Sequence, residues 1–183
     1  MTWDAFHRRG EVLRNVLQHA ETRRDGALPM ELPGVAETFG DEVTLLGALQ
    51  LRWHTRLAGA IERELMGQPM DLEAAVLTAW RKTASELSGV RAILDACTEA
   101  PTSAEMAHML DTAHRKDWTL MAAMAGKASP SDKGAARVGH ALERRAREAY
   151  SPVRPRSNEV GRRRAEPSAR QSVLDRVKAH LVA

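Results

Sequence analysis

Apolar side chains recur every three or four residues through most of the first 125 residues of this chain, and no stretch alternates between apolar and polar residues. The first spacing places apolar side chains on one face of an α-helix, whereas alternation would place them on one face of a strand. The sequence therefore predicts an all-α fold. A chain of 183 residues is expected to form one domain with an appended segment, not two full domains.

Breaks in the apolar pattern divide residues 1–150 into about five helices, which we expect to form an up-and-down bundle. The predicted helices cover residues 2–22, 41–66, 71 onward with an interruption at the ELSGV run, 102–125, and 131 or 132 to 150. Asp71 is a good N-cap, Thr102 with Glu105 matches a capping box, and Gly126 suits the left-handed residue after a helix. Each of the first four helices places one tryptophan in or near the core; these are Trp3, Trp53, Trp80 and Trp118.

The basic charge of the chain is concentrated after residue 150. Residues 151–183 hold eight basic and three acidic residues, a net charge of +5, whereas residues 1–150 hold 19 basic and 21 acidic residues, a net charge of −2. Residues 151–170 are rich in arginine, proline and serine and cannot form a core, so we expect a disordered linker. Residues 171–183 predict a short amphipathic helix that needs a surface to pack against. The candidate binding residues of this tail are Arg162, Arg163, Arg164, Arg170, Val173, Leu174, Val177 and Leu181.

Several chemistries find no support in the sequence. A single cysteine, Cys97, excludes an intrachain disulfide, and its apolar neighbours predict a packed thiol. Neither a glycine-rich phosphate loop nor a Gly-x-Ser-x-Gly elbow is present. The N-terminal residues do not have the pattern of a secretory signal, and no apolar run is long enough to span a membrane. We therefore expect a cytoplasmic protein, and the sequence implies no cofactor.

The polar residues on the apolar faces are the candidates for chemistry inside the bundle. Asp117 falls within the apolar stripe of its helix and His114 at the edge of that stripe, while His54 and Glu64 lie near the apolar side of the second helix. If the two helices are neighbours, these four could meet in a polar pocket suited to metal binding or acid–base catalysis. The alternative is a satisfied hydrogen bond in the core, or a carboxylate that reaches water at a helix end.

A metal site is not predicted from the Glu105-x-x-His108 spacing. Carboxylate-bridged di-iron bundles use two such motifs and two further glutamates that all face inward. The sequence offers one motif, and the 100° advance per residue places both of its side chains opposite the apolar stripe. We therefore expect Glu105 and His108 to face solvent.

Several runs in residues 2–97 resemble an uncharacterised all-helical protein family of high-GC actinobacteria. The runs are TWDAFHRRGEVLR, GVAETFGDE, LLGALQLRWHTRLAGAIE, QPMDLEAAV and GVRAILDA. The abundance of alanine and of arginine over lysine suits a high-GC genome. The resemblance implies an all-helical cytoplasmic protein, and it brings no activity, cofactor or catalytic residue with it.

Three functional hypotheses follow from the sequence. The first is a non-enzymatic adaptor whose basic tail and C-terminal helix bind a protein or nucleoprotein partner, in transcription or translation. The second is a small metal-dependent or acid–base enzyme that uses His54, Glu64, His114 and Asp117. The third is sequence-independent binding of nucleic acid by the tail together with Arg145 and Arg147, because arginines without interleaved aromatic residues contact phosphates and not bases.

Overall fold

The computed structural model describes the backbone of residues 3–150 and the side chains of residues 7–150. This part of the chain forms seven helices and no strand, which confirms the all-α prediction. The helices are α1 (Trp3–Arg23), α2 (Val35–Phe39), α3 (Glu42–Met66), α4 (Leu72–Glu86), α5 (Ser88–Glu99), α6 (Ala104–Met124) and α7 (Ala135–Glu148). The predicted linker at 151–170, the predicted helix at 171–183 and the Trp3 side chain lie outside the described residues.

The difference between five predicted and seven observed helices arises at two places. The predicted interruption in the third helix is confirmed, because Leu87 has φ −121° and ψ 43° and separates α4 from α5. The short helix α2 has no counterpart among the predicted helices, since five residues are too few to show a helical period. Two glycines flank it, Gly34 and Gly40, with φ of 82° and 80°, a conformation that favours glycine.

Side-chain caps fix the starts of three long helices. The carboxylate of Asp41 accepts a hydrogen bond from Thr44 N at 2.7 Å, and that of Asp71 accepts one from Ala74 N at 2.9 Å, as expected for N-caps. The predicted cap at Thr102 is wrong by one residue. Ser103 Oγ accepts from Met106 N at 3.1 Å, whereas the hydroxyl of Thr102 donates to Glu42 on α3 at 2.9 Å. Thr102 therefore connects the start of α6 to α3, and Ser103 is the N-cap of α6.

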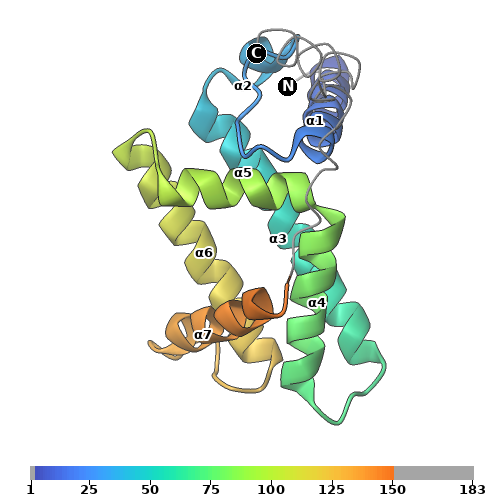
Figure 1. Ribbon diagram of the computed structural model, residues 1–183, viewed down its shortest axis with the longest axis vertical. Helices are drawn as coiled ribbons and strands as arrows, with labels where there is room; N and C mark the ends of the chain where they lie inside the picture. Colours follow the sequence, from blue (N-terminus) through green and yellow to red (C-terminus); the bar gives the residue numbers. More distant parts are fainter. Residues whose placement is uncertain (1–2, 151–183) are drawn as a thin grey trace, which may run out of the picture.

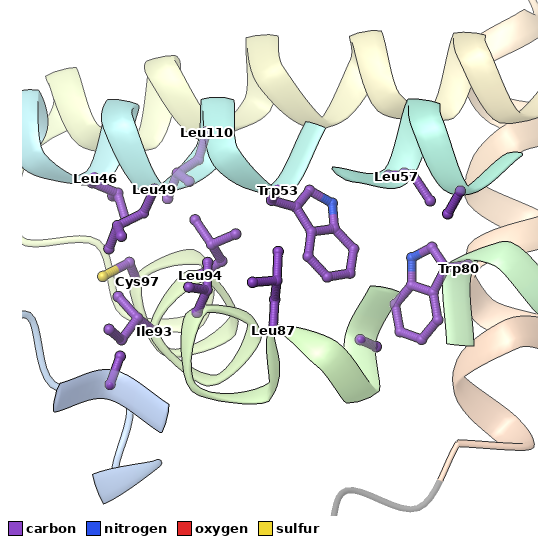
Figure 2. Close-up of a cluster of buried hydrophobic side chains, with 14 of the residues drawn as sticks. Leu46, Leu49, Trp53, Leu57, Trp80, Leu87, Ile93, Leu94, Cys97 and Leu110 are labelled. Carbon is purple, nitrogen blue, oxygen red and sulfur yellow. The ribbon is translucent and has the colours of Figure 1, made fainter. Parts of the chain in front are cut away.

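The core lies where α3, α4 and α5 meet (Figure 2). Trp53 on α3 and Trp80 on α4 are each 1% exposed, and their rings meet edge to face with centroids 5.8 Å apart. Leucines of α3 and α5 extend this cluster toward the buried thiol of Cys97 (Figure 2). Burying each large aliphatic side chain contributes about 1.5–3 kcal/mol. Trp53 and Trp80 are thus core residues as predicted, while Trp118 is only half-buried.

The helices alternate in direction only in part. α3 and α4 form an antiparallel pair, as expected of an up-and-down bundle, but α5 and α7 lie across the neighbouring helices (Figure 1). α3 and α6 run side by side in the same general direction (Figure 1). That arrangement brings the middle of α3 close to the middle of α6. None of the helices in residues 3–150 has both the length and the apolar character needed to cross a bilayer.

Two glycines allow the crossing helices to approach closely. A Cβ atom on Gly139 of α7 would lie 1.8 Å from the backbone oxygen of Trp118 on α6. A Cβ atom on Gly89 of α5 would lie 2.2 Å from the backbone oxygen of Ala20 on α1. Only glycine fits at either crossing. These contacts hold α7 against α6 and α1 against the start of α5.

Candidate functional site: a histidine–aspartate pair at a groove

A groove of about 640 Å³ lies between α3 and α6. Its apolar lining includes Val43, Gly47 and Leu51 from α3 and Met109 and Ala113 from α6. Leu51 is 65% exposed, so this apolar surface is open to solvent. The polar lining comes from both helices and consists of Gln50, His54, Glu105, His108, Thr112, Lys116 and Asp117.

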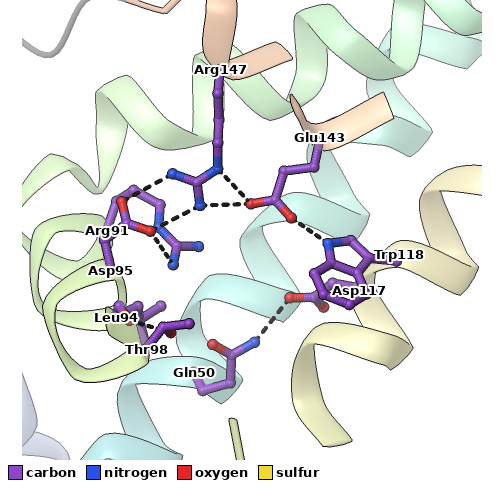
Figure 3. A network of polar contacts seen from close by, with 9 residues as sticks. All are labelled: Gln50, Arg91, Leu94, Asp95, Thr98, Asp117, Trp118, Glu143 and Arg147. Atoms are coloured by element: carbon purple, nitrogen blue, oxygen red, sulfur yellow. Dashed lines mark hydrogen bonds and ion pairs between the residues drawn. The ribbon is translucent and has the colours of Figure 1, made fainter. Parts of the chain in front are cut away.

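Asp117 joins the two helices at this groove. Its Oδ1 atom lies 2.5 Å from His54 Nδ1, and its Oδ2 atom accepts a hydrogen bond from Gln50 Nε2 at 2.9 Å. The second of these bonds is drawn in Figure 3. Gln50 and His54 are four residues apart on α3, so they project from the same face of that helix. Both oxygens of a carboxylate from α6 are therefore held by α3.

Burial sets the electrostatics of this pair. The Asp117 side chain is 6% exposed, and the loss of solvent raises the pKa of its carboxyl, while the hydrogen bonds from His54 and Gln50 oppose that rise. The His54 side chain is 40% exposed. A buried carboxylate bonded to Nδ1 favours the tautomer that carries its proton on Nδ1 and leaves Nε2 free to accept one. A half-exposed histidine oriented in this way can act as a general base in the groove.

The other two candidates from the sequence do not join this pair. Glu64 lies ten residues beyond His54 on α3, and its Oε1 atom is 2.6 Å from Nζ of Lys82 on α4. The ring of His114 lies against Trp118, with centroids 5.6 Å apart, and burial lowers the pKa of its imidazole, helped by the charge of Arg91. The expectation that all four side chains converge is therefore wrong for Glu64 and His114, because Glu64 lies farther along α3 and pairs with Lys82, and His114 packs against Trp118.

A network of ion pairs joins α5 to α7 (Figure 3). The guanidinium of Arg147 binds both oxygens of Asp95, at 3.1 and 2.8 Å, and Oε1 of Glu143 at 2.9 and 2.7 Å. The other oxygen of Glu143 accepts a hydrogen bond from the indole N–H of Trp118 on α6. Burial works to raise the pKa of Glu143, but Arg147, Arg91 and Trp118 together hold it below its ordinary value.

Arg91 completes the network from the core side. It is 3% exposed, and its guanidinium lies over the ring of Trp53 at 4.7 Å from the centroid. Its Nη2 atom is 2.9 Å from Asp95 Oδ1, an ion-pair contact without the geometry of a hydrogen bond. Since Arg91 is matched by Asp95, and Arg147 by Glu143, the cluster balances two positive charges with two negative ones.

Sequence reasoning did not identify Gln50, and it did not predict that the four charged residues of this network pair with one another. Gln50 carries a recognisable signal, because it is a polar residue four positions before His54 on a helix with a long apolar face. Asp95 and Arg147 are 52 residues apart, and no spacing along the chain indicates that they pair. Arg145, predicted as a phosphate contact, binds Glu73 of α4, and Arg147 is engaged in the network.

Neither side chain of the Glu105-x-x-His108 motif is buried, as predicted, and both line the rim of the groove. Among the side chains of residues 7–150, no three histidine, cysteine, aspartate or glutamate residues gather into a group that could hold a metal ion. The functional groups that line the groove are therefore histidine and carboxyl side chains, which can exchange protons, and the amine of Lys116.

Comparison with known proteins gives this site no described counterpart, since the chain matches no protein-family model, no curated protein and no solved structure. The resemblance to an actinobacterial family stays a prediction.

Proposed function

We propose that the groove between α3 and α6 binds a small organic ligand and that His54 exchanges a proton with it as a general base. The observation that carries this proposal is the bond between His54 Nδ1 and the buried Asp117 Oδ1, at the wall of an open groove. This proposal is the second of the three hypotheses from the sequence, in its acid–base form. The four candidate residues of that hypothesis are replaced by one pair, His54 and Asp117.

The groove has the composition of a ligand site. Binding sites for small molecules are mostly apolar concavities of about 300–1,000 Å³ with a few polar groups that fix orientation. The walls here are mostly apolar, while His54 on α3 supplies a base and Lys116 on α6 supplies a positive charge. A substrate with an apolar body and an anionic or carbonyl group fits this distribution.

Thr112 is the one hydroxyl-bearing residue among those that line the groove, and the hydrogen-bond partner of His54 is Asp117 and not Thr112. We therefore propose that the proton accepted by His54 comes from water or from the substrate and not from a nucleophilic side chain of the protein. For an ester, water oxygen would bond to the carbonyl carbon as His54 Nε2 takes the water proton. The bond from carbon to the leaving oxygen then breaks, and the imidazolium returns its proton to the alcohol or to solvent.

Activated esters test this role without knowledge of the natural substrate. We expect the full chain to hydrolyse p-nitrophenyl butyrate with saturation kinetics. The variant His54→Gln should lose most of the activity above buffer, since general-base catalysis contributes about 10²–10⁴-fold. His108→Gln removes a histidine from the rim of the same groove and is the matched control, with near-normal kcat expected. Equal rates for wild type and His54→Gln would overturn the proposal.

A second candidate function rests on the charge of the tail. We propose that residues 151–183, with a net charge of +5, form a disordered linker and a short helix that attach a cytoplasmic helical domain to an acidic protein or nucleoprotein partner. We also propose that the chain belongs to the uncharacterised all-helical actinobacterial family that residues 2–97 resemble. The support is the contrast with residues 1–150, whose net charge is −2.

Substitutions within the full chain test this second candidate. Capture from a cell lysate is compared between wild type, a variant with Arg162, Arg163 and Arg164 changed to glutamine, and a variant with Val177→Asp and Leu181→Asp. A partner lost from the first variant alone and at high salt would indicate binding of phosphates or acidic residues. A partner lost from the second would indicate docking of the helix. Retention of every partner by both variants would contradict the adaptor function.

A further inference from the structure

Three of the four large apolar side chains that are exposed in residues 7–150 lie around one turn. Met66 at the end of α3 is 81% exposed, Met70 in the turn is fully exposed, and Leu72 at the start of α4 is 42% exposed. Since solvent offers no favourable contact to these side chains, their concentration at one end of the molecule marks an interaction surface. We call Met66, Met70 and Leu72 the apolar tip.

Basic side chains border the apolar tip on the same end of the molecule. The turn between α3 and α4 and the connection between α6 and α7 both lie at the lower end in Figure 1. A hollow of about 350 Å³ opens there, lined by Lys127 of that connection and by Arg137 and Arg145 of α7. The hollow adjoins the tip through Glu73, the residue after Leu72.

This hollow carries an excess of positive charge. Glu73 is its one carboxylate, and it binds both Lys127, at 3.0 Å from Nζ, and Arg145. Among the side chains of residues 7–150, no carboxylate forms an ion pair with Arg137. Three cations thus face one anion. Asp71 and Asp132, which lie in the two chain connections at this end, do not line the hollow and accept hydrogen bonds from the backbone N–H groups of Ala74 and Ser129, respectively.

We propose that this end of the molecule docks on an anionic phospholipid membrane. The apolar tip inserts among the acyl chains near the headgroups, while Lys127, Arg137 and Arg145 contact lipid phosphates. The combination of apolar side chains that enter the interface and basic residues beside them is how peripheral proteins bind anionic bilayers. A protein partner would explain the apolar tip equally well, but the adjoining unpaired charge favours a surface of phosphates.

Co-sedimentation with vesicles of phosphatidylcholine and phosphatidylglycerol tests this docking on the full chain. We expect the double variant Met66→Gln, Met70→Gln to lower the partition coefficient at least about tenfold, because each methionine loses its apolar contact with the interface. Arg137→Gln should lower it about fivefold, the effect of one basic residue at such a surface. Pure phosphatidylcholine vesicles should bind more weakly than the mixed ones.

Two matched controls separate this surface from the basic tail and from general effects of substitution. Leu51→Gln removes an exposed apolar side chain 15 residues before Met66 on the same helix, about 22 Å away, and should bind as wild type does. Arg52→Gln removes an exposed arginine far from the tip and serves the same purpose for Arg137. A variant with Arg162, Arg163 and Arg164 changed to glutamine should keep the dependence on the methionines.

Protection from oxidation gives a second readout. Met66 and Met70 should be oxidised by hydrogen peroxide in solution and protected in the presence of anionic vesicles, as measured by peptide mass spectrometry. Vesicle binding that is unchanged in the double methionine variant would overturn the proposal, and so would oxidation of both methionines at the same rate with and without vesicles. Absence of binding to anionic vesicles, or loss in the variants of binding to a nucleic acid instead, would also overturn it.

Discussion

Asp117 is held by two donors from another helix, so its removal affects more than one side chain. Replacing it with alanine leaves Gln50 Nε2 and His54 Nδ1 without their acceptor and opens space in a buried position. We expect Asp117→Ala to lower the free energy of unfolding by about 2–3 kcal/mol.

The variant Asp117→Asn should lose less than about 1 kcal/mol, because the amide keeps the shape and one acceptor oxygen without burying a charge. Urea unfolding at neutral pH measures both variants. A stability equal to that of the wild type in Asp117→Ala would contradict the described hydrogen bonds.

The burial of the His114 imidazole predicts that the stability of the folded protein depends on pH. Burial lowers the pKa of its imidazole in the folded protein below the ordinary 6.5, so the unfolded chain binds a proton at a higher pH than the folded one. Its contribution to stability is therefore complete above the ordinary pKa and is lost as the pH falls from there through the lower folded-state value.

Urea unfolding of the wild type and of His114→Gln between pH 7.5 and 5.5 measures this contribution. We expect the variant to lose less stability than the wild type over this interval. His108→Gln, which removes an exposed histidine from the same helix, is the matched control. Parallel curves for wild type and His114→Gln would show that the imidazole titrates alike in both states.

At the scale of the helices, the close contact of α7 with α6 depends on Gly139. A methyl group there would overlap the backbone of Trp118, and a helix backbone cannot move away without separating the two helices. We expect Gly139→Ala to cost at least about 3 kcal/mol, which is the upper part of the range for overpacking.

Gly10 in α1 provides the control for this substitution, because a Cβ atom there meets nothing within 4 Å. Gly10→Ala should raise the stability by about 0.5–1 kcal/mol through helix propensity alone. Thermal unfolding followed by circular dichroism compares the two. A harmless Gly139→Ala would contradict the described helix crossing.

The helices themselves were largely predictable because their signals are local. The cap at Asp71, the break near Leu87 and the left-handed Gly126, with φ of 66°, each depend on a few neighbouring residues. The cap at the start of α6 was misplaced because Thr102 and Ser103 are adjacent and both suit an N-cap. Only the contact of Thr102 with Glu42 on α3 decides between them.

The candidate site was predictable only in part, since it depends on which helices meet. A carboxylate within an apolar stripe indicates a buried partner, and this pointed to Asp117 correctly. The sequence could not identify His54 as its partner, because that contact depends on α3 lying beside α6. Glu64, which was a candidate together with His54, lies farther along α3 and binds Lys82.

For the molecule as a whole, α6 connects the ion-pair network to the groove. Arg147 links α7 to α5, and Glu143 links α7 to Trp118 on α6, one residue after Asp117. The network therefore fixes the position of α6 against α7, while Asp117 binds α6 to α3. Burial raises the pKa of the Asp117 carboxyl, the negative charge of Glu143 adds to this rise, and the hydrogen bonds from His54 and Gln50 oppose it.

The tautomer of His54 in the intact chain is the most direct test of this account. Long-range ¹H–¹⁵N correlation NMR of the imidazoles at neutral pH should show a proton on Nδ1 and a free Nε2 for His54, and this pattern should be lost in Asp117→Asn, whose amide group can donate to Nδ1 instead. Exposed His108 should show the averaged pattern of a histidine without a fixed partner. A His54 that resembles His108, or one that is unaffected by Asp117→Asn, would contradict the claim that Asp117 orients a base in the groove.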